Sequence, residues 1–157
     1  MPIDIFLKLE GITGESNDAQ HRDEIDALSW SWSMAIPAPA PGGAAGKVSF
    51  GALTIAKRVD AATPKLMLSC ASAQHVRSAL LTVRRRSATP FEYLKIRLDD
   101  VVVTSVAVGE PGHGGEATET VTLAFREVRL DYVGQSDTGA ATPPVSFGWD
   151  LVRNVKL

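Results

Sequence analysis

Apolar and polar residues alternate with a period of two along most of the chain, which is typical of half-buried β-strands. Near the N-terminus, Ile3, Ile5, Leu7 and Leu9 alternate with other residues. A second and cleaner pattern puts bulky residues at 28, 30, 32 and 34 and small residues between them. Further strands are expected at 48–57, 79–86, 92–108, 119–132 and 145–155. The pattern predicts a mainly β protein.

The segment 119–132 changes phase, because Val121, Leu123 and Phe125 are followed by Val128 and Leu130. A β-bulge near residues 126–127 would supply the extra residue that this change requires, and it would bend the strand. Bent strands are needed to close a barrel. We therefore expect an antiparallel β-barrel.

One short helix interrupts the strands. Thr63 is a suitable N-cap and Pro64 suits the first helical position, so a helix is predicted at about residues 64–72. Leu66, Met67 and Cys70 would form its buried side. The expected fold is a single-domain antiparallel β-barrel over residues 1–157, with this α-helix on its flank.

Composition excludes several function classes. The chain has 157 residues, of which 45% are hydrophobic and 22% charged, and a net charge of −2. These values are those of a globular protein without an electrostatic drive toward nucleic acid. No apolar run is long enough to insert in a membrane, and the N-terminus has no signal-peptide pattern. The lone Cys70 fits folding in the cytoplasm.

The residues offer little catalytic chemistry. His21, His75 and His113 are scattered, and we expect no metal site and no cofactor. The acidic residues near His21 leave a hydrolase as one open alternative. The tryptophans at 30, 32 and 149 leave a second alternative, a monomeric barrel that binds a small ligand, although core packing is the simpler role for them.

Other features favour assembly. Ser29, Ser31 and Ser33, opposite the tryptophans, would suit the wall of a wet channel. The segment 36–46 is rich in Pro, Ala and Gly and poor in polar groups, which indicates docking on another surface. We expect contacts from Ile36, Pro37, Pro39, Pro41, Gly42 and Gly43. The basic run Arg84, Arg85 and Arg86 is expected to form salt bridges with a neighbouring chain.

Several short stretches occur in an order that resembles one protein family. They are Phe6-Leu7-Lys8, Gly14-Glu15-Ser16, Glu24-Ile25-Asp26, Trp30-Ser31-Trp32, Thr63-Pro64, Tyr93-Leu94, Val121-Thr122-Leu123 and Phe147-Gly148-Trp149-Asp150. Together they resemble the haemolysin-coregulated protein (Hcp) family, whose members form the tube of type VI secretion systems. The likeness extends from residue 3 to the end of the chain.

The resemblance implies a structural role without catalysis. Six copies would close into a ring, and rings would stack into a tube that a contractile sheath propels, behind a VgrG spike. The lumen would carry small effector proteins, and the tube would be assembled in the cytoplasm and secreted without a signal peptide. The chain departs from the family at Ala73, where a glycine is expected after the helix, and in the basic run 84–86. No added C-terminal toxin domain is expected.

Overall fold

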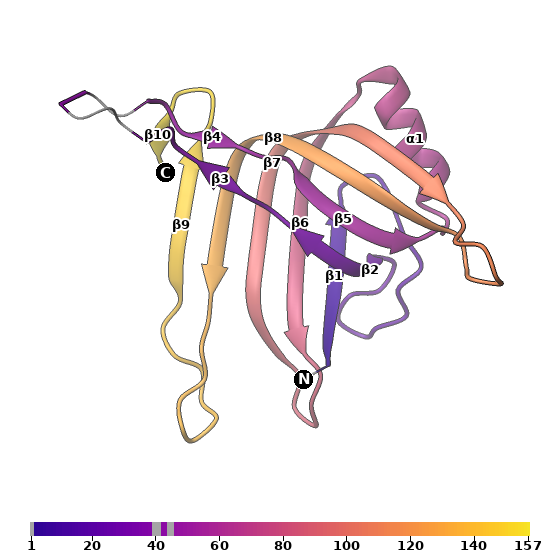
Figure 1. Ribbon diagram of the computed structural model, residues 1–157. Coiled ribbons are helices and arrows are strands. Elements are labelled where there is room, and N and C mark those ends of the chain that lie inside the picture. Colours follow the sequence, from indigo (N-terminus) through magenta and orange to yellow (C-terminus); the bar gives the residue numbers. More distant parts are fainter. Residues whose placement is uncertain (1, 39–41, 44–45) are drawn as a thin grey trace.

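The structure is a computed structural model that describes residues 2–38, 42–43 and 46–157 (Figure 1). Strands dominate this part of the chain, and one helix lies between them. The elements are β1 (Ile3–Leu9), β2 (Ile25–Ser31), β3 (Met34–Ala35), β4 (Ser49–Phe50), β5 (Leu53–Arg58), α1 (Thr63–Ser72), β6 (His75–Arg85), β7 (Phe91–Gly109), β8 (Thr118–Tyr132), β9 (Val145–Asp150) and β10 (Val155–Lys156). The mainly β fold with one short helix is confirmed.

The main sheet closes on itself. Strands β8, β5, β2, β1, β6 and β7 are paired in that order, all antiparallel, and β7 pairs back with β8. Strand β8 is long enough to pair with two strands along the same edge: residues 118–123 pair with β5, and residues 127–132 pair with β9. Strand β10 then pairs with β9. The predicted antiparallel barrel is therefore confirmed, with β9 and β10 as added strands.

The change of phase in β8 is present, but β7 and β8 accommodate it together. Leu123 and Val128 are both buried although they are five positions apart, an odd spacing that would put them on opposite faces of a regular strand. Asp99 pairs with Glu127, and the register of the two strands is the same on both sides of the change. Strand β7 changes phase at the same level, where Asp100 has a φ of 54°. The one-residue shift of register lies between residues 103 and 105 of β7, so the bulge predicted at residues 126–127 is misplaced.

A second irregularity corrects the predicted face of β2. Ala27 pairs with Lys57 and Ser29 with Ala56, so Leu28 is an extra residue on this strand. An extra residue reverses the alternation of faces. Leu28 is 44% exposed, and the prediction that it shares the buried face of Trp30 is wrong.

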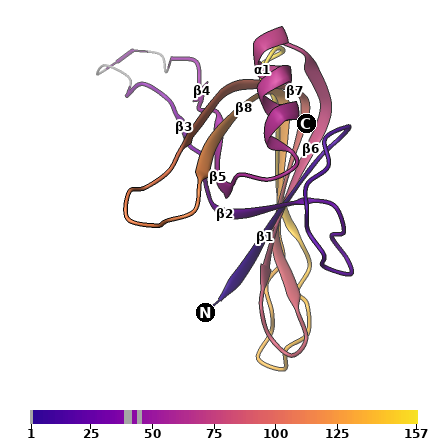
Figure 2. The same ribbon diagram turned by 90° about the vertical axis from the view of Figure 1, so that its right-hand side faces the viewer.

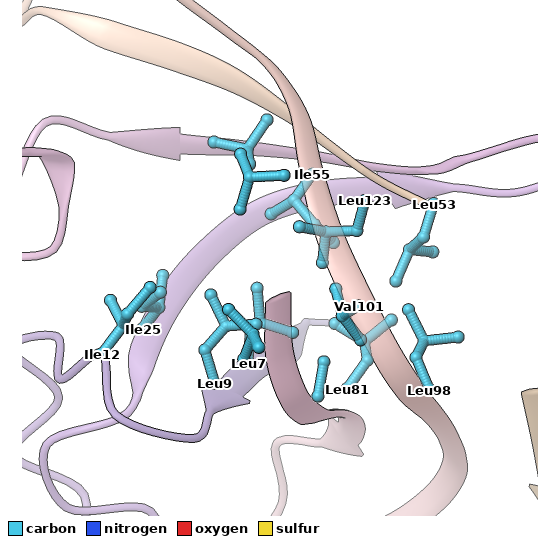
Figure 3. Close-up of a cluster of buried hydrophobic side chains, with 14 of the residues drawn as sticks. Leu7, Leu9, Ile12, Ile25, Leu53, Ile55, Leu81, Leu98, Val101 and Leu123 are labelled. Atoms are coloured by element: carbon cyan, nitrogen blue, oxygen red, sulfur yellow. The ribbon is translucent and has the colours of Figure 1, made fainter. Parts of the chain in front are cut away.

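Buried aliphatic side chains from every barrel strand fill the interior. Figure 3 shows part of this core, in which residues of β1, β2, β5, β6, β7 and β8 point toward one another. The labelled members are Leu7, Leu9, Ile12, Ile25, Leu53, Ile55, Leu81, Leu98, Val101 and Leu123. The barrel is therefore a packed core and not an open channel.

Helix α1 stands beside the barrel (Figure 2) and differs in detail from the prediction. It begins at Thr63, and Ala62 occupies the N-cap position without a side-chain hydrogen bond. The Thr63 hydroxyl instead accepts a hydrogen bond from the backbone N–H of Asp60 at 3.0 Å. Leu66 is buried as predicted, but Met67 is 43% exposed. The residue after the helix, Ala73, has a φ of 53° in the left-handed region.

A buried ion pair joins the first turn of α1 to the barrel. The Lys57 ammonium on β5 donates to Glu119 on β8 and to Asp60 Oδ1, the latter at 2.7 Å. The Thr63 hydroxyl donates to Glu119 Oε1 at 2.8 Å. Lys57 and Glu119 are among the most buried large side chains of the described chain. The cluster holds the start of the helix to two barrel strands.

Candidate functional site

The three serines predicted to line a channel lie on the outer surface of the barrel. Ser29, Ser31 and Ser33 are exposed, whereas Trp30 and Trp32 are half-buried and pack against the core. The indole N–H of Trp32 donates to the carbonyl oxygen of Gly51 at 3.0 Å. The predicted alternation of faces is correct from Ser29 to Ser33, and the tryptophans take part in core packing. Met34, predicted on the face of the tryptophans, is 46% exposed, so that part of the prediction is wrong.

Strand pairing extends this surface across three more strands. Ser31 pairs with Thr54 on β5, Thr54 pairs with Thr122 on β8, and Thr122 pairs with Ser105 on β7. The neighbouring row is formed in the same way from Ser29, Ala56, Thr120 and Ala107. We call this surface the hydroxyl wall; it consists of Ser29, Ser31, Thr54, Ala56, Thr104, Ser105, Ala107, Thr120 and Thr122. Each of these side chains is small and uncharged.

The bulge in β7 concentrates hydroxyl groups at the end of this row. It places Thr104 and Ser105 next to the same residue of β8, and Thr122 Oγ1 lies 2.7 Å from both Thr104 Oγ1 and Ser105 Oγ. Bulges re-aim side chains in this way. Thr104 and Ser105 are exposed and Thr122 is half-buried, so the cluster faces the surroundings of the barrel.

The other side of the barrel has a different character. On β1, β6 and the first half of β7, charged side chains face outward: Lys8 and Arg97 flank Leu80 on neighbouring strands. Arg97 forms a salt bridge with Asp99 at 3.3 Å, and Arg77 forms one with Glu10 at 3.6 Å. The barrel thus presents a neutral wall on one side and a charged wall on the other.

The two strands on either side of the segment predicted to dock, β3 and β4, form an arm. Strands β3 and β4 pair with each other in a separate two-stranded sheet, and they lead away from the barrel in Figures 1 and 2. Met34 is 46% exposed and Ile36 is 52% exposed. Pro37, Gly42 and Gly43 are also exposed. Pro39 and Pro41 lie outside the described residues.

The structure gives the basic run partners within the chain. Arg84 is buried and donates to Asp18 at 2.7 Å and to Asp4 at 2.9 Å. The hydrogen bond from Arg84 lowers the pKa of Asp18 to about 2. Arg86 also binds Asp4, at 2.6 Å. Arg84 is therefore engaged within the chain, because alternation in β6 points it at the loop that carries Asp18.

Arg85 faces the opposite way from Arg84. Its guanidinium lies 4.7 Å from the ring centroid of Tyr93, a cation–π contact. Its exposed contact with Gln135 is long, at 3.5 Å. Arg85 and Arg86 are the members of the run whose charge reaches the surface.

His21 is held in place by contacts with residues from three parts of the chain. It is buried, and its ring stacks on Phe6 with centroids 4.2 Å apart. One ring nitrogen lies 3.0 Å from Glu24 and the other lies 2.6 Å from Glu92. Burial of Glu92 raises the pKa of its carboxyl, but the interactions with His21 and Lys95 together outweigh burial, and the net shift of this pKa is downward. This arrangement clamps the loop that precedes β2 onto the barrel.

Within the residues that the structure describes, no three His, Cys, Asp or Glu side chains come together as metal ligands. No helix in that part of the chain has the length and apolarity to cross a membrane.

A closed antiparallel barrel with one flanking helix places the protein in the class of small β-barrel proteins. The chain belongs to the Hcp family of type VI secretion: the family model described as "Type VI secretion system effector, Hcp" matches residues 6–132. Protein hcp1 of Pseudomonas aeruginosa is 44% identical to it over 99% of both chains.

Solved structures agree with this chain over 94% or more of its length. Hcp1 from Salmonella typhimurium is 34% identical, covers 100% of both chains and has a TM-score of 0.83. A type VI secretion system effector from Yersinia pestis is 31% identical, covers 94% of this chain and 99% of its own, and has a TM-score of 0.77. A structure described only as a type six secretion system protein, 26% identical, has a TM-score of 0.92 over 99% of this chain and 100% of its own. The family resemblance expected from the sequence is confirmed.

The serines of β2 were predicted to line a channel, whereas the hydroxyl groups on the other strands of the wall were not predicted. Thr120 and Thr122 alternate with buried Val121 and Leu123, so their outward direction was readable from the sequence. What was missing was the order of the strands, which places them beside Ser29 and Ser31 through β5.

Proposed function

We propose that this chain is the structural, non-catalytic subunit of a type VI secretion inner tube. Six copies close into a ring, rings stack into a tube, and the tube leaves the cytoplasm with small effector proteins in its lumen. A VgrG spike and contractile sheath proteins are its other partners. Membership of the Hcp family supports this role, and so does the likeness to Hcp structures over the full length of the chain.

The arm is the observation in the structure that carries the proposal. A two-stranded ribbon has little stability by itself in water. Here it also exposes Met34 and Ile36, which are 46% and 52% exposed. Contact with another copy would bury these side chains and support the ribbon. We therefore assign residues 36–46 to a contact between subunits or between stacked rings.

We assign the hydroxyl wall, with Ser29, Ser31 and Ser33, to the lumen. A water-filled channel favours small polar side chains on its wall, whereas the charged strands β1 and β6 would then face away from it. We also assign Arg85 and Arg86 to contacts between subunits, since both reach the surface, although Arg86 is already paired with Asp4.

The mass of the purified protein in solution tests the ring. Light scattering after size exclusion is expected to give about six times the mass of the chain, as a closed cyclic assembly requires. A monomer at high concentration would refute the ring and favour the small barrel that binds a ligand.

Deletion of residues 36–46 tests the arm. We expect loss of the ring or of stacking into tubes, measured by light scattering and electron microscopy, and loss of secretion. Removing the exposed residues 110–114 of the β7–β8 loop is the matched control and should change neither. If the arm deletion leaves both stacking and secretion intact, the arm is not a contact.

A further inference from the structure

The hydroxyl wall is a continuous neutral surface on a barrel whose other side is charged. Its two rows cross β2, β5, β8 and β7 without an ionisable side chain. The first outward ionisable residue along β5 is Arg58, which pairs with Thr118 at the end of the sheet face and forms a salt bridge with Glu116 at 2.9 Å. Outward charge on this strand therefore begins only at the margin of the wall.

The side chains of the hydroxyl wall are short, so a bound partner can approach the backbone of the sheet closely. Serine and threonine hydroxyls each donate one hydrogen bond and accept others, and they can rotate to suit a partner. The cluster of Thr104, Ser105 and Thr122 is the densest group of such hydroxyls on the wall, and Thr54 lies beside it through its pairing with Thr122. A charged partner would lose hydration here without gaining an opposite charge.

We propose that the hydroxyl wall selects cargo by hydrogen bonding to uncharged polar surface, and that Thr54, Thr104, Ser105 and Thr122 are its specificity-determining residues. The cargo surface that fits is rich in Asn, Gln, Ser and Thr side chains and low in net charge. This inference rests on the proposed function, since it takes the wall to face the lumen. A ring repeats the cluster once in each subunit, so weak contacts add up on one cargo molecule.

The effect of salt on cargo affinity distinguishes binding through neutral hydrogen bonds from binding driven by charge. Exposed charge pairs are screened over a Debye length of about 8 Å at physiological ionic strength, so charge-driven binding weakens as salt is added. Hydrogen bonding between neutral groups has no such dependence. Cargo binding to this wall is therefore insensitive to ionic strength.

The experiment uses one small folded domain made in three versions that differ only at a fixed set of surface positions. The first version carries Asn and Gln at these positions, the second carries Lys, and the third carries Glu. Each version is fluorescently labelled, and its anisotropy is measured as assembled rings are added at low and at high salt. We expect the Asn and Gln version to bind best, with an affinity that changes by less than about twofold between the two salt conditions. Stronger binding of the Lys or Glu version, or binding that high salt abolishes, would overturn the proposal.

Variants locate the interaction. The double substitution Thr54→Val and Thr122→Val keeps side-chain shape and removes two hydroxyls, and it is expected to weaken binding of the Asn and Gln version by about tenfold. Thr138→Val, on an exposed loop away from the wall, is the control and should have no effect. Thr54→Glu should shift the preference toward the Lys version. Unchanged binding by both wall variants would place the contact elsewhere and refute the assignment.

The mass of each assembly distinguishes failure of the proposed function from failure of the proposed cargo chemistry. Failure of the native chain to form rings would contradict the proposed function, whereas native rings that prefer a charged version contradict only the cargo chemistry. If the double variant does not assemble, binding of the three domain versions to native rings at low and high salt still tests the proposed cargo chemistry.

Discussion

Substitution of the buried ion pair of Lys57 and Glu119 tests how strongly this pair, which holds helix α1 to the barrel, stabilises the fold. Breaking a buried ion pair by removing one partner costs about 3–5 kcal/mol, because the other charge stays buried without compensation. Lys57→Met leaves Glu119 with only the hydroxyl of Thr63 as a side-chain donor among the described residues, so its cost should lie near the upper value. Glu119→Leu leaves Lys57 bonded to Asp60 at 2.7 Å, so its cost should lie near the lower value.

The double variant discriminates the ion pair from mere packing. Lys57→Met with Glu119→Leu replaces both charges by apolar groups of similar length, an exchange that is often neutral in buried pairs. We expect the double variant to be within about 1 kcal/mol of the native protein. The two single variants should lower the melting temperature by roughly 10 °C, given about 2–4 °C per kcal/mol for a chain of this size.

Thermal and denaturant unfolding at one fixed protein concentration would measure these differences, since assembly stabilises the folded state by mass action. The control pair is Arg58 and Glu116, which comes from the same part of the fold but is 60% and 76% exposed at the side chains. Arg58→Met should cost less than about 1 kcal/mol. Single substitutions at 57 and 119 that are as mild as this control, or costs that simply add in the double variant, would contradict a stabilising ion pair between the two residues.

Three further outcomes are expected. Ala73→Gly should raise the unfolding free energy by about 0.5–1 kcal/mol, because Ala73 has a φ of 53° at the end of α1 and glycine adopts this region without strain; no gain on denaturant unfolding would contradict this. The lowered pKa of Asp18, about 2 against an ordinary 3.8, means that its ion pair stabilises the protein above about pH 4 and that this contribution is lost as the pH falls toward 2. Asp18→Asn should therefore cost about 1–2 kcal/mol at about pH 5 and almost nothing near pH 2, whereas Asp137→Asn, on an exposed loop, should cost little at either pH; equal costs of Asp18→Asn at both values would refute the role of the pair. Ser31→Trp should leave the mass of the ring unchanged while excluding cargo, with Thr138→Trp as control, and failure of the ring itself would show that Ser31 lies in a subunit contact.

Local patterns were enough to predict much of this protein. Period-two alternation is set by the backbone of a strand, so β1, β6 and the faces of Trp30 and Trp32 could be predicted from the sequence. The helix was predicted within one residue at its start, because proline and the helix formers after it act locally. Its buried side was only partly correct: Met67 and Leu66 are neighbours in sequence, and only the position of the barrel makes Leu66 the one that faces inward.

Other features depended on which strands become neighbours. The extra residue at Leu28 shows only when β2 is paired with β5, since nothing in the residues themselves marks the bulge. Arg84 sits in a basic run that suggested an intermolecular contact, yet Asp18, distant in sequence, folds over it and neutralises it. His21 likewise meets Glu92 only because the loop before β2 closes on β7.

The hydroxyl wall shows the same division. Alternation within each strand is sufficient to point Ser31, Thr54 and Thr122 away from the core, because the direction of a side chain depends on its own strand alone. That these residues and Ser105 form one row could not be read from the chain. Hydrogen bonding between strands that are distant in sequence sets both their order and their register, and it exists only in the folded barrel.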